Sequence, residues 1–140
     1  MLFSSLNKYR DVGLLILRIG VGFTFIFIHG YSKITAGVEG WRNYGGAMKV
    51  VGITFAPEFW GFMSAFAEFF GGILLFLGLL FRPAMILLVI NMAIAFASTY
   101  TRTGTISQSA WPLEILTLMV ALFIIGPGKY SLDQLLFKGK

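Results

Sequence analysis

Two carboxylates and one histidine lie inside long apolar segments, where an ionisable side chain is costly. Glu68 is surrounded by phenylalanine, alanine and glycine, His29 follows a long apolar run, and Glu114 follows Trp111 and Pro112. Placing a charged side chain at the bilayer centre costs about 2.5 to 3.5 kcal/mol on insertion scales, so such residues need a reason. Carboxylates and imidazole accept, donate and carry protons, which makes all three candidates for a ligand-binding or proton-carrying site.

Three more polar residues lie in or at the ends of these segments: Arg18, Lys33 and Asn91. Residues three, four or seven positions apart share one face of a helix, so Arg18 and Lys33 fall on the same side of their segment as His29. At 1.5 Å per residue from one membrane face, Arg18 lies at roughly 9 Å, Glu68 at about 20 Å and His29 at about 25 Å. We therefore expect Glu68, His29 and Glu114 to form one constellation, with Arg18 below it and Lys33 above.

Structural interpretations stand beside these functional ones. Glu68 could simply hold helices together by pairing with Arg18 or His29, since structural ion pairs also perturb pKa values and are not specific to functional sites. Unpaired, it would be protonated at neutral pH. His29 could be an interface histidine with its hydrogen bonds satisfied.

The other candidates also have structural interpretations. The position of Arg18 near the cytoplasmic end favours a side chain that extends to the lipid headgroups. The position of Lys33 at a helix end favours a role as an interfacial anchor for the same reason. Glu114 could equally be exposed at the outer headgroup level. Asn91 is more typical of a hydrogen bond between helices than of a ligand contact.

Several classes of chemistry are excluded or unsupported. The chain has no cysteine, which rules out a disulfide or a thiolate ligand within it, and its one histidine rules out bis-histidine haem ligation. No zinc motif, dinucleotide fingerprint or catalytic triad is present. We assign no metal ligand and no catalytic residue, and activity of its own stays open.

The composition indicates an integral membrane protein. Of 140 residues, 57% are hydrophobic and only 12% are charged, more apolar surface than a soluble domain of this length can bury. The net charge of +5 comes from basic residues that flank apolar segments, which favours the membrane surface over nucleic acid as their partner. Residues 1–140 form a single domain.

Four segments are long enough to cross a bilayer, at residues 12–34, 58–81, 83–101 and 111–125. The first is interpreted as a retained helix and not as a cleaved signal peptide. The last is short for a span, and a start near residue 107 is the alternative. A tight turn at Arg82 makes the second and third segments antiparallel. The sequence thus predicts an all-α bundle of four antiparallel transmembrane helices, with a short, partly helical interfacial segment within 35–57.

Small residues mark the packing face of the second segment. Gly61, Ser64, Ala65, Glu68, Gly71 and Gly72 share one face, and Phe62, Phe66, Phe69, Phe70 and Ile73 share the opposite one. Small residues let helices approach closely in lipid. We therefore expect Glu68 to point into a helix interface. Asn91, Ala95, Ser98 and Arg102 align on the third segment, as do Glu114, Thr117 and Ala121 on the fourth, and the simplest packing turns all four polar stripes inward.

Basic residues set the expected orientation. One side holds Lys8, Arg10, Arg82, Lys129, Lys138 and Lys140, and the other holds Arg42, Lys49 and Arg102, with Lys33 at a helix end. This bias places both termini in the cytoplasm, and the three tryptophans, Trp41, Trp60 and Trp111, at the outer surface.

The order and spacing of these residues resemble the DoxX family of small bacterial membrane proteins. The markers are Leu17-Arg18, His29-Gly30, Lys33, Glu68, Gly71-Gly72, Gly78, Arg82, Glu114 and the run from Gly126 to Leu132. The resemblance implies a bundle of four transmembrane helices. It also implies a link to thiosulfate:quinone oxidoreductase, to resistance against quinones and oxidants, or to membrane complexes with thiol and superoxide enzymes.

The preferred hypothesis is a bacterial inner-membrane subunit of a redox or oxidative-stress system that binds a quinone-like amphiphile in a polar pocket. A quinone is the possible cofactor, and a redox protein or a second copy of the chain is the possible partner. The alternatives are a non-enzymatic scaffold and a carrier for a small hydrophobic substrate, for which four helices are few.

Overall fold

The computed structural model describes residues 4–137, and all the regular structure in that range is helical. The first long helix is continuous but not uniform. It comprises a 3-10 turn η1 (Ser4–Tyr9), α1 (Arg10–Phe23), a π-helical segment η2 (Thr24–Gly30) and α2 (Tyr31–Ile34). Its stretch Leu6–Ile34, 29 residues, is long and apolar enough to cross a membrane. The predicted segment 12–34 is therefore confirmed, with an earlier start.

Three further helices can also span a membrane: α4 (Pro57–Leu77), α5 (Phe81–Thr103) and α6 (Ile106–Ile125). The turn between α4 and α5 lies at residues 78–80, just before the expected Arg82, because Gly78 takes a positive φ of 65° and ends α4. Helix α6 begins at Ile106, so the earlier of the two starts considered for the fourth segment is correct. The prediction of four spanning helices is confirmed.

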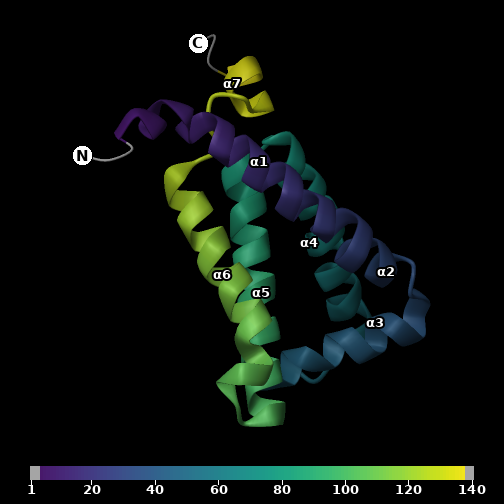
Figure 1. Cartoon of the computed structure of the whole chain (residues 1–140). Coiled ribbons are helices and arrows are strands. Elements are labelled where there is room, and N and C mark those ends of the chain that lie inside the picture. The colour runs from purple at the N-terminus through teal and green to yellow at the C-terminus, as the bar shows by residue number, and fades with distance from the viewer. Residues whose placement is uncertain (1–3, 138–140) are drawn as a thin grey trace.

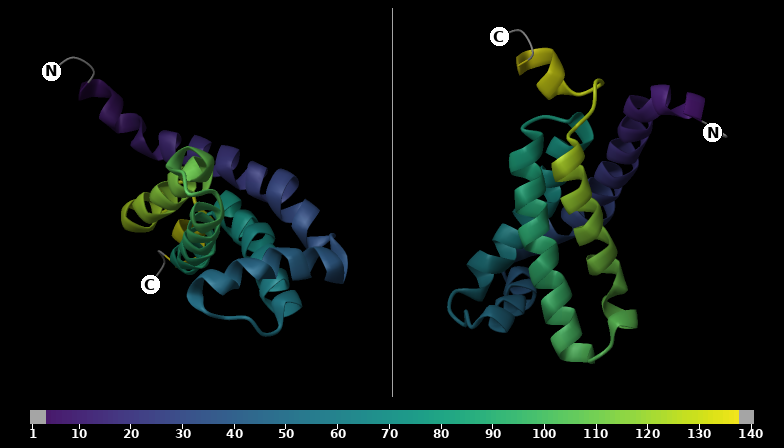
Figure 2. Two further views of the ribbon diagram at one scale, coloured as in Figure 1. Left: turned by 90° about the horizontal axis from the view of Figure 1, so that it is seen from below. Right: turned by 90° about the vertical axis from the view of Figure 1, so that its left-hand side faces the viewer.

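The helices form a bundle in which the first one crosses the others obliquely. Helices α5 and α6 lie side by side in all views, while α1 runs diagonally across the bundle and α4 lies beneath it (Figures 1 and 2). The first and last described helical segments, η1 and α7 (Leu132–Phe137), lie at the same end (Figure 1). The arrangement is consistent with the expected antiparallel order. Lys138 and Lys140, which contribute to the charge bias, lie outside the described residues.

The segment between the first two spans is helical and crosses the opposite end of the molecule (Figure 1). It consists of α3 (Gly37–Gly45) and a 3-10 segment η3 (Gly46–Val51). A Cβ on Gly45 would collide with the backbone of Pro57, and one on Gly61 with that of Trp41, so α3 and α4 touch backbone to backbone. Arg42 donates to Glu58 Oε1 at 2.8 Å across this contact. That hydrogen bond raises the pKa of Arg42 above its ordinary value.

Glycine also sets the distance between α4 and its two long neighbours. A Cβ on Gly72 would lie 2.7 Å from Phe25 Cβ, and one on Gly22 would lie 2.8 Å from Phe76 Cβ. Gly71 faces α5 instead, with Leu88 Cγ 3.1 Å from the position of its missing Cβ. The predicted small-residue face of α4 is confirmed, and the exposed Phe66 and Phe70 lie opposite it.

Candidate functional site

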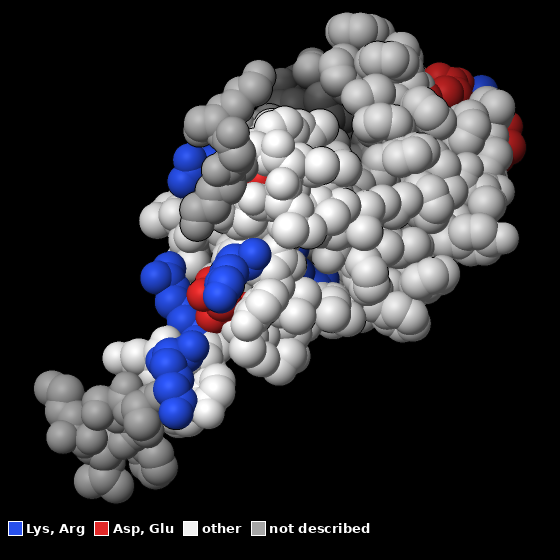
Figure 3. Space-filling model, turned by 90° about the horizontal axis from the view of Figure 1, so that it is seen from above, with Lys and Arg blue, Asp and Glu red and all other residues white. Residues whose placement is uncertain are grey.

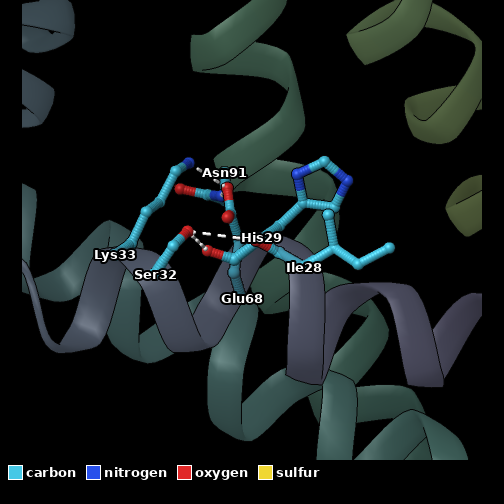
Figure 4. Close-up of polar contacts among 6 residues, drawn as sticks. All are labelled: Ile28, His29, Ser32, Lys33, Glu68 and Asn91. Atoms are coloured by element: carbon cyan, nitrogen blue, oxygen red, sulfur yellow. Dashed lines mark hydrogen bonds and ion pairs between the residues drawn. The ribbon is translucent and has the colours of Figure 1, made fainter.

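Glu68 joins three helices through one carboxylate oxygen. Its Oε1 accepts hydrogen bonds from Lys33 Nζ at 2.5 Å and from Asn91 Nδ2 at 2.9 Å. Figure 4 shows the lysine and the asparagine reaching this carboxylate from two sides. The side chain of Glu68 is 1% exposed and that of Lys33 is 24% exposed. The buried carboxylate is therefore balanced by an ammonium group and not left alone.

The close approach of the first helix to α4 allows this pair to form. Gly30 has no side chain, and a Cβ there would lie 2.6 Å from Phe69 Cα. The backbone of the first helix thus rests on the turn of α4 that carries Glu68. Lys33 follows one turn after Gly30 on the same face, so its long side chain reaches the carboxylate.

The π-helical segment changes which residues of the first helix face α4. The backbone N–H of Tyr31 bonds to the carbonyl of Ile26, five residues back, instead of the usual four. As a result the buried positions run Arg18, Gly22, Phe25 and then Gly30. A regular helix would have continued this face through His29.

His29 consequently lies beside the pair without bonding to it. Its imidazole packs against the indole of Trp111, with ring centroids 4.5 Å apart and ring planes tilted by 35°. No hydrogen bond or ion pair joins it to Glu68 within residues 4–137. The expected pairing of Glu68 with His29 is wrong in this geometry, because the wide turn rotates the imidazole toward α6.

Arg18 is also absent from the Glu68 network, and it does not extend to the headgroups as we expected. It is 1% exposed. Its Nη2 donates to the backbone carbonyl of Tyr130 at 2.5 Å. The expectation failed because the chain after α6 folds back over this end of α1 and supplies a buried acceptor.

For Lys33 and Glu114 the sequence left two locations open, inside the bundle or at the membrane interface. Lys33 is not a simple interfacial anchor, since its amine is paired with Glu68 and lies 5.3 Å from the centre of the Tyr44 ring. Glu114 is exposed, as is Thr117 one turn later. The polar stripe of α6 therefore faces outward, and Glu114 does not join the constellation. The hydrogen bond expected of Asn91 between helices is confirmed.

A cavity of about 490 Å³ opens next to the pair, between η3, α4 and α5. Most of its wall is apolar. Its polar or amphipathic members are Lys33, Tyr44, Trp60, Ser64, Asn91, Ser98 and Thr99. Asn91, Ala95 and Ser98, which align on one face of α5, all line it, whereas Arg102 does not.

Two buried polar atoms in this region lack a hydrogen-bond partner among the described residues: Trp60 Nε1 and Glu68 Oε2. An indole N–H is a donor only and a carboxylate oxygen an acceptor. The unpartnered donor belongs to a residue of the cavity wall, and the unpartnered acceptor belongs to the pair behind that wall. The sequence analysis placed Trp60 at the outer interface and missed that it lines this cavity. Its spacing of four and seven residues from Ser64 and Ala67 on α4 was the available signal.

No group of three or more histidine, aspartate and glutamate side chains able to hold a metal occurs in the described part of the chain. The arrangement is suited instead to an apolar molecule that carries a few hydrogen-bonding groups. Such pockets are typically 300 to 1,000 Å³ with few polar groups.

Comparison with known proteins identifies one family and two relatives. The model of the DoxX family matches residues 13–101. The chain is 30% identical over 135 residues to the "Putative oxidoreductase CatD" of Bacillus subtilis (strain 168), covering 96% of this chain and 95% of that protein. It is 32% identical over 136 residues to the "Inner membrane protein YqjF" of Escherichia coli (strain K12), covering 95% and 98%. No solved structure matches the chain.

Proposed function

Because the chain belongs to the DoxX family, we propose that it is the membrane subunit of a redox or oxidative-stress system and binds a quinone-like amphiphile in the cavity beside Lys33. The observation that carries this proposal is the Lys33–Glu68–Asn91 network at the edge of an otherwise apolar cavity of about 490 Å³. An oxidoreductase name among its relatives agrees with a redox setting.

The chemistry of a quinone fits the groups available. A quinone ring has two carbonyl oxygens that only accept hydrogen bonds, and the cavity wall holds donors at Lys33, Asn91 and Trp60. The apolar side chains of Met48, Met63 and Ile94 cover the faces of a ring. An isoprenoid tail would leave between α4 and α5 toward the lipid.

Glu68 and Lys33 together supply a proton route to the bound ring. Reduction of a quinone to a quinol takes two electrons and two protons. In this proposal the electrons come from a redox partner protein. The ammonium group of Lys33 donates protons to the ring oxygens and is reprotonated from water, while the Glu68 carboxylate holds that ammonium group in place. His29, packed against Trp111, lies on the neighbouring side of the bundle and does not line the cavity.

The test is direct binding. Purified protein in nanodiscs is titrated with a short-chain ubiquinone and a short-chain menaquinone, and co-purified quinone is sought by mass spectrometry. Lys33→Met should weaken binding at least about tenfold, the value of one good charged hydrogen bond. Glu68→Gln should weaken it by a smaller factor, because it removes the carboxylate that positions the Lys33 amine. Glu114→Gln, on the exposed face of α6, is the matched control.

Equal affinity of all three variants would overturn the proposal. A stoichiometric protein partner in pull-downs from native membranes, together with no bound quinone, would indicate a scaffold instead. Substrate flux into proteoliposomes would indicate a carrier.

The orientation and partners are part of the same proposal. The protein is a multi-pass protein of the bacterial inner membrane. We place both termini on the cytoplasmic side, where Lys8, Arg10, Arg82 and Lys129 gather. A redox protein or a second copy of the chain docks on the exposed helix faces. Labelling of a cysteine introduced near either terminus, with a reagent that cannot cross the membrane, tests the orientation.

A further inference from the structure

Three basic side chains converge on a second cavity, at the end of the bundle that carries the termini. Arg10 at the start of α1, Arg82 in α5 and Lys129 after α6 line this space, whose volume is about 420 Å³. None of the three forms an ion pair within the described residues. Figure 3 shows basic side chains gathered on this face around acidic ones. Asp11 also lines the cavity, leaving a net charge of +2 on the charged side chains of its wall.

The cavity is built by a folded segment, residues 126–133, that is fastened to two helices. Gly128 has a positive φ of 78°, and a Cβ there would lie 3.1 Å from Leu14 Cδ1. The backbone N–H of Lys129 donates to Asp11 Oδ1 at 2.9 Å, which ties the segment to α1. Asp133 accepts from the backbone N–H of Leu80 and Phe81 at 2.8 and 2.9 Å, which ties it to the start of α5.

The remaining wall is of two kinds. Ile125, at the end of the spanning helix α6, is apolar and exposed, so it lies on the side of the hydrocarbon, whereas Leu14 is buried in the core beneath the cavity. Gln134 also lines the cavity, and its buried Oε1 has no hydrogen-bond partner in the described structure. The cavity therefore combines cations that suit a phosphate, an acceptor that suits a hydroxyl, and an apolar side that suits an acyl chain.

We propose that this cavity binds the headgroup of an anionic phospholipid that carries a hydroxyl group, of the phosphatidylglycerol type. Arg10, Arg82 and Lys129 hold the phosphate diester, the free oxygen of Gln134 accepts from the headgroup hydroxyl, and the acyl chains pass beside the exposed Ile125. Basic pockets between transmembrane helices are typical sites for anionic lipid headgroups. The bound lipid joins α1, α5 and the segment after α6, at the end of the bundle away from the Lys33–Glu68 pair.

The experiment measures lipid retention by native mass spectrometry. Full-length protein is reconstituted with equal amounts of phosphatidylglycerol and phosphatidylcholine of the same acyl chains, then extracted in mild detergent. The wild type should retain phosphatidylglycerol selectively. Each basic side chain near an anionic surface contributes about a fivefold factor, so R82Q/K129Q should lower retention roughly 25-fold.

Matched variants separate this site from general charge. K49Q/R102Q removes two exposed basic side chains at the opposite end and should retain lipid as the wild type does. R82K/K129R keeps the charges and should also retain it, which shows that loss in the first variant is not misfolding. Equal retention by R82Q/K129Q and K49Q/R102Q would overturn the proposal, as would equal retention of both lipids by the wild type.

The source of the phosphate is distinguished by competition. A large excess of inorganic phosphate or of glycerol 3-phosphate should leave the bound lipid in place, because neither carries acyl chains. Displacement by either would show that the site is for a soluble anion, and would overturn the assignment to a lipid.

Discussion

The amine of Lys33 lies 2.5 Å from Glu68 Oε1, although the two residues are 35 positions apart in the chain. The pair is asymmetric, since the carboxylate is almost fully enclosed while about a quarter of the lysine side chain is exposed. The lysine borders the apolar cavity, and the glutamate lies behind it. An arrangement of this kind stabilises the contact between the first helix and α4, and it also places a charged donor where a ligand can reach it.

Glu68→Gln should lower the free energy of unfolding by about 2 kcal/mol. Removing one partner of a fully buried pair costs about 3 to 5 kcal/mol, and the partial exposure of Lys33 reduces this. The measurement is SDS-induced unfolding in mixed micelles. Glu114→Gln, which removes an exposed carboxylate, should stay within about 0.5 kcal/mol of the wild type. Equal losses of unfolding free energy in the two variants would contradict a buried ion pair at Glu68.

The coupling between the two partners can be measured separately. The double variant Lys33→Met, Glu68→Gln should be less destabilised than the sum of its single variants, by roughly 0.5 to 3 kcal/mol, because the two side chains are in contact. The same unfolding assay completes the double-mutant cycle. Additive losses would show that the two charges do not interact in the membrane.

Gly30→Ala should destabilise the protein by about 1 to 3 kcal/mol through overpacking. The new methyl group would lie 2.6 Å from Phe69 Cα, so the first helix must move away from α4 and carry Lys33 with it. Gly20→Ala is the control, since a Cβ there meets nothing within 4 Å. It should be neutral or slightly stabilising. A loss in Gly20→Ala as large as that in Gly30→Ala would argue against close packing at Gly30.

Trp60→Phe should weaken quinone binding about five- to tenfold, because it keeps an aromatic ring but removes the unpartnered N–H in the cavity wall. Displacement of a labelled short-chain quinone from nanodiscs measures the effect. Trp111→Phe changes a tryptophan that does not line the cavity and should keep the wild-type affinity. If both variants bind alike, the indole N–H of Trp60 has no part in recognition.

Asp133→Ala should free the segment after α6. It removes the acceptor for the backbone N–H groups of Leu80 and Phe81 at the start of α5, a loss comparable to that of a helix cap, about 1 to 2 kcal/mol. Limited proteolysis should then cleave near residues 126–133 faster than in the wild type. Glu39→Ala, whose side chain is 83% exposed, should leave the cleavage rate unchanged. An unchanged rate in Asp133→Ala would mean that the segment is held by other contacts.

The sequence by itself determined the number of spanning helices and the packing face of α4. Both follow from local patterns: the length of an apolar run sets a span, and glycine or alanine at helical spacing marks where backbones approach. Gly72 against Phe25 and Gly71 against Leu88 follow that rule. The burial of Glu68 and the hydrogen bond of Asn91 could be predicted for the same reason.

The partner of Glu68 was decided only by the tertiary structure. The five-residue turn between Ile26 and Tyr31 shifts the face of the first helix, which replaces His29 by Gly30 at the contact and brings Lys33 to the carboxylate. Apolar burial does not drive helices together in lipid, so the hydropathy pattern does not determine how α6 is rotated about its axis. Only the fold shows that Glu114 faces outward. The hydrogen bond from Arg18 to the backbone carbonyl of Tyr130, 112 residues away, could not be predicted either. Every residue has a backbone carbonyl, and only the fold decides which one lies near Arg18.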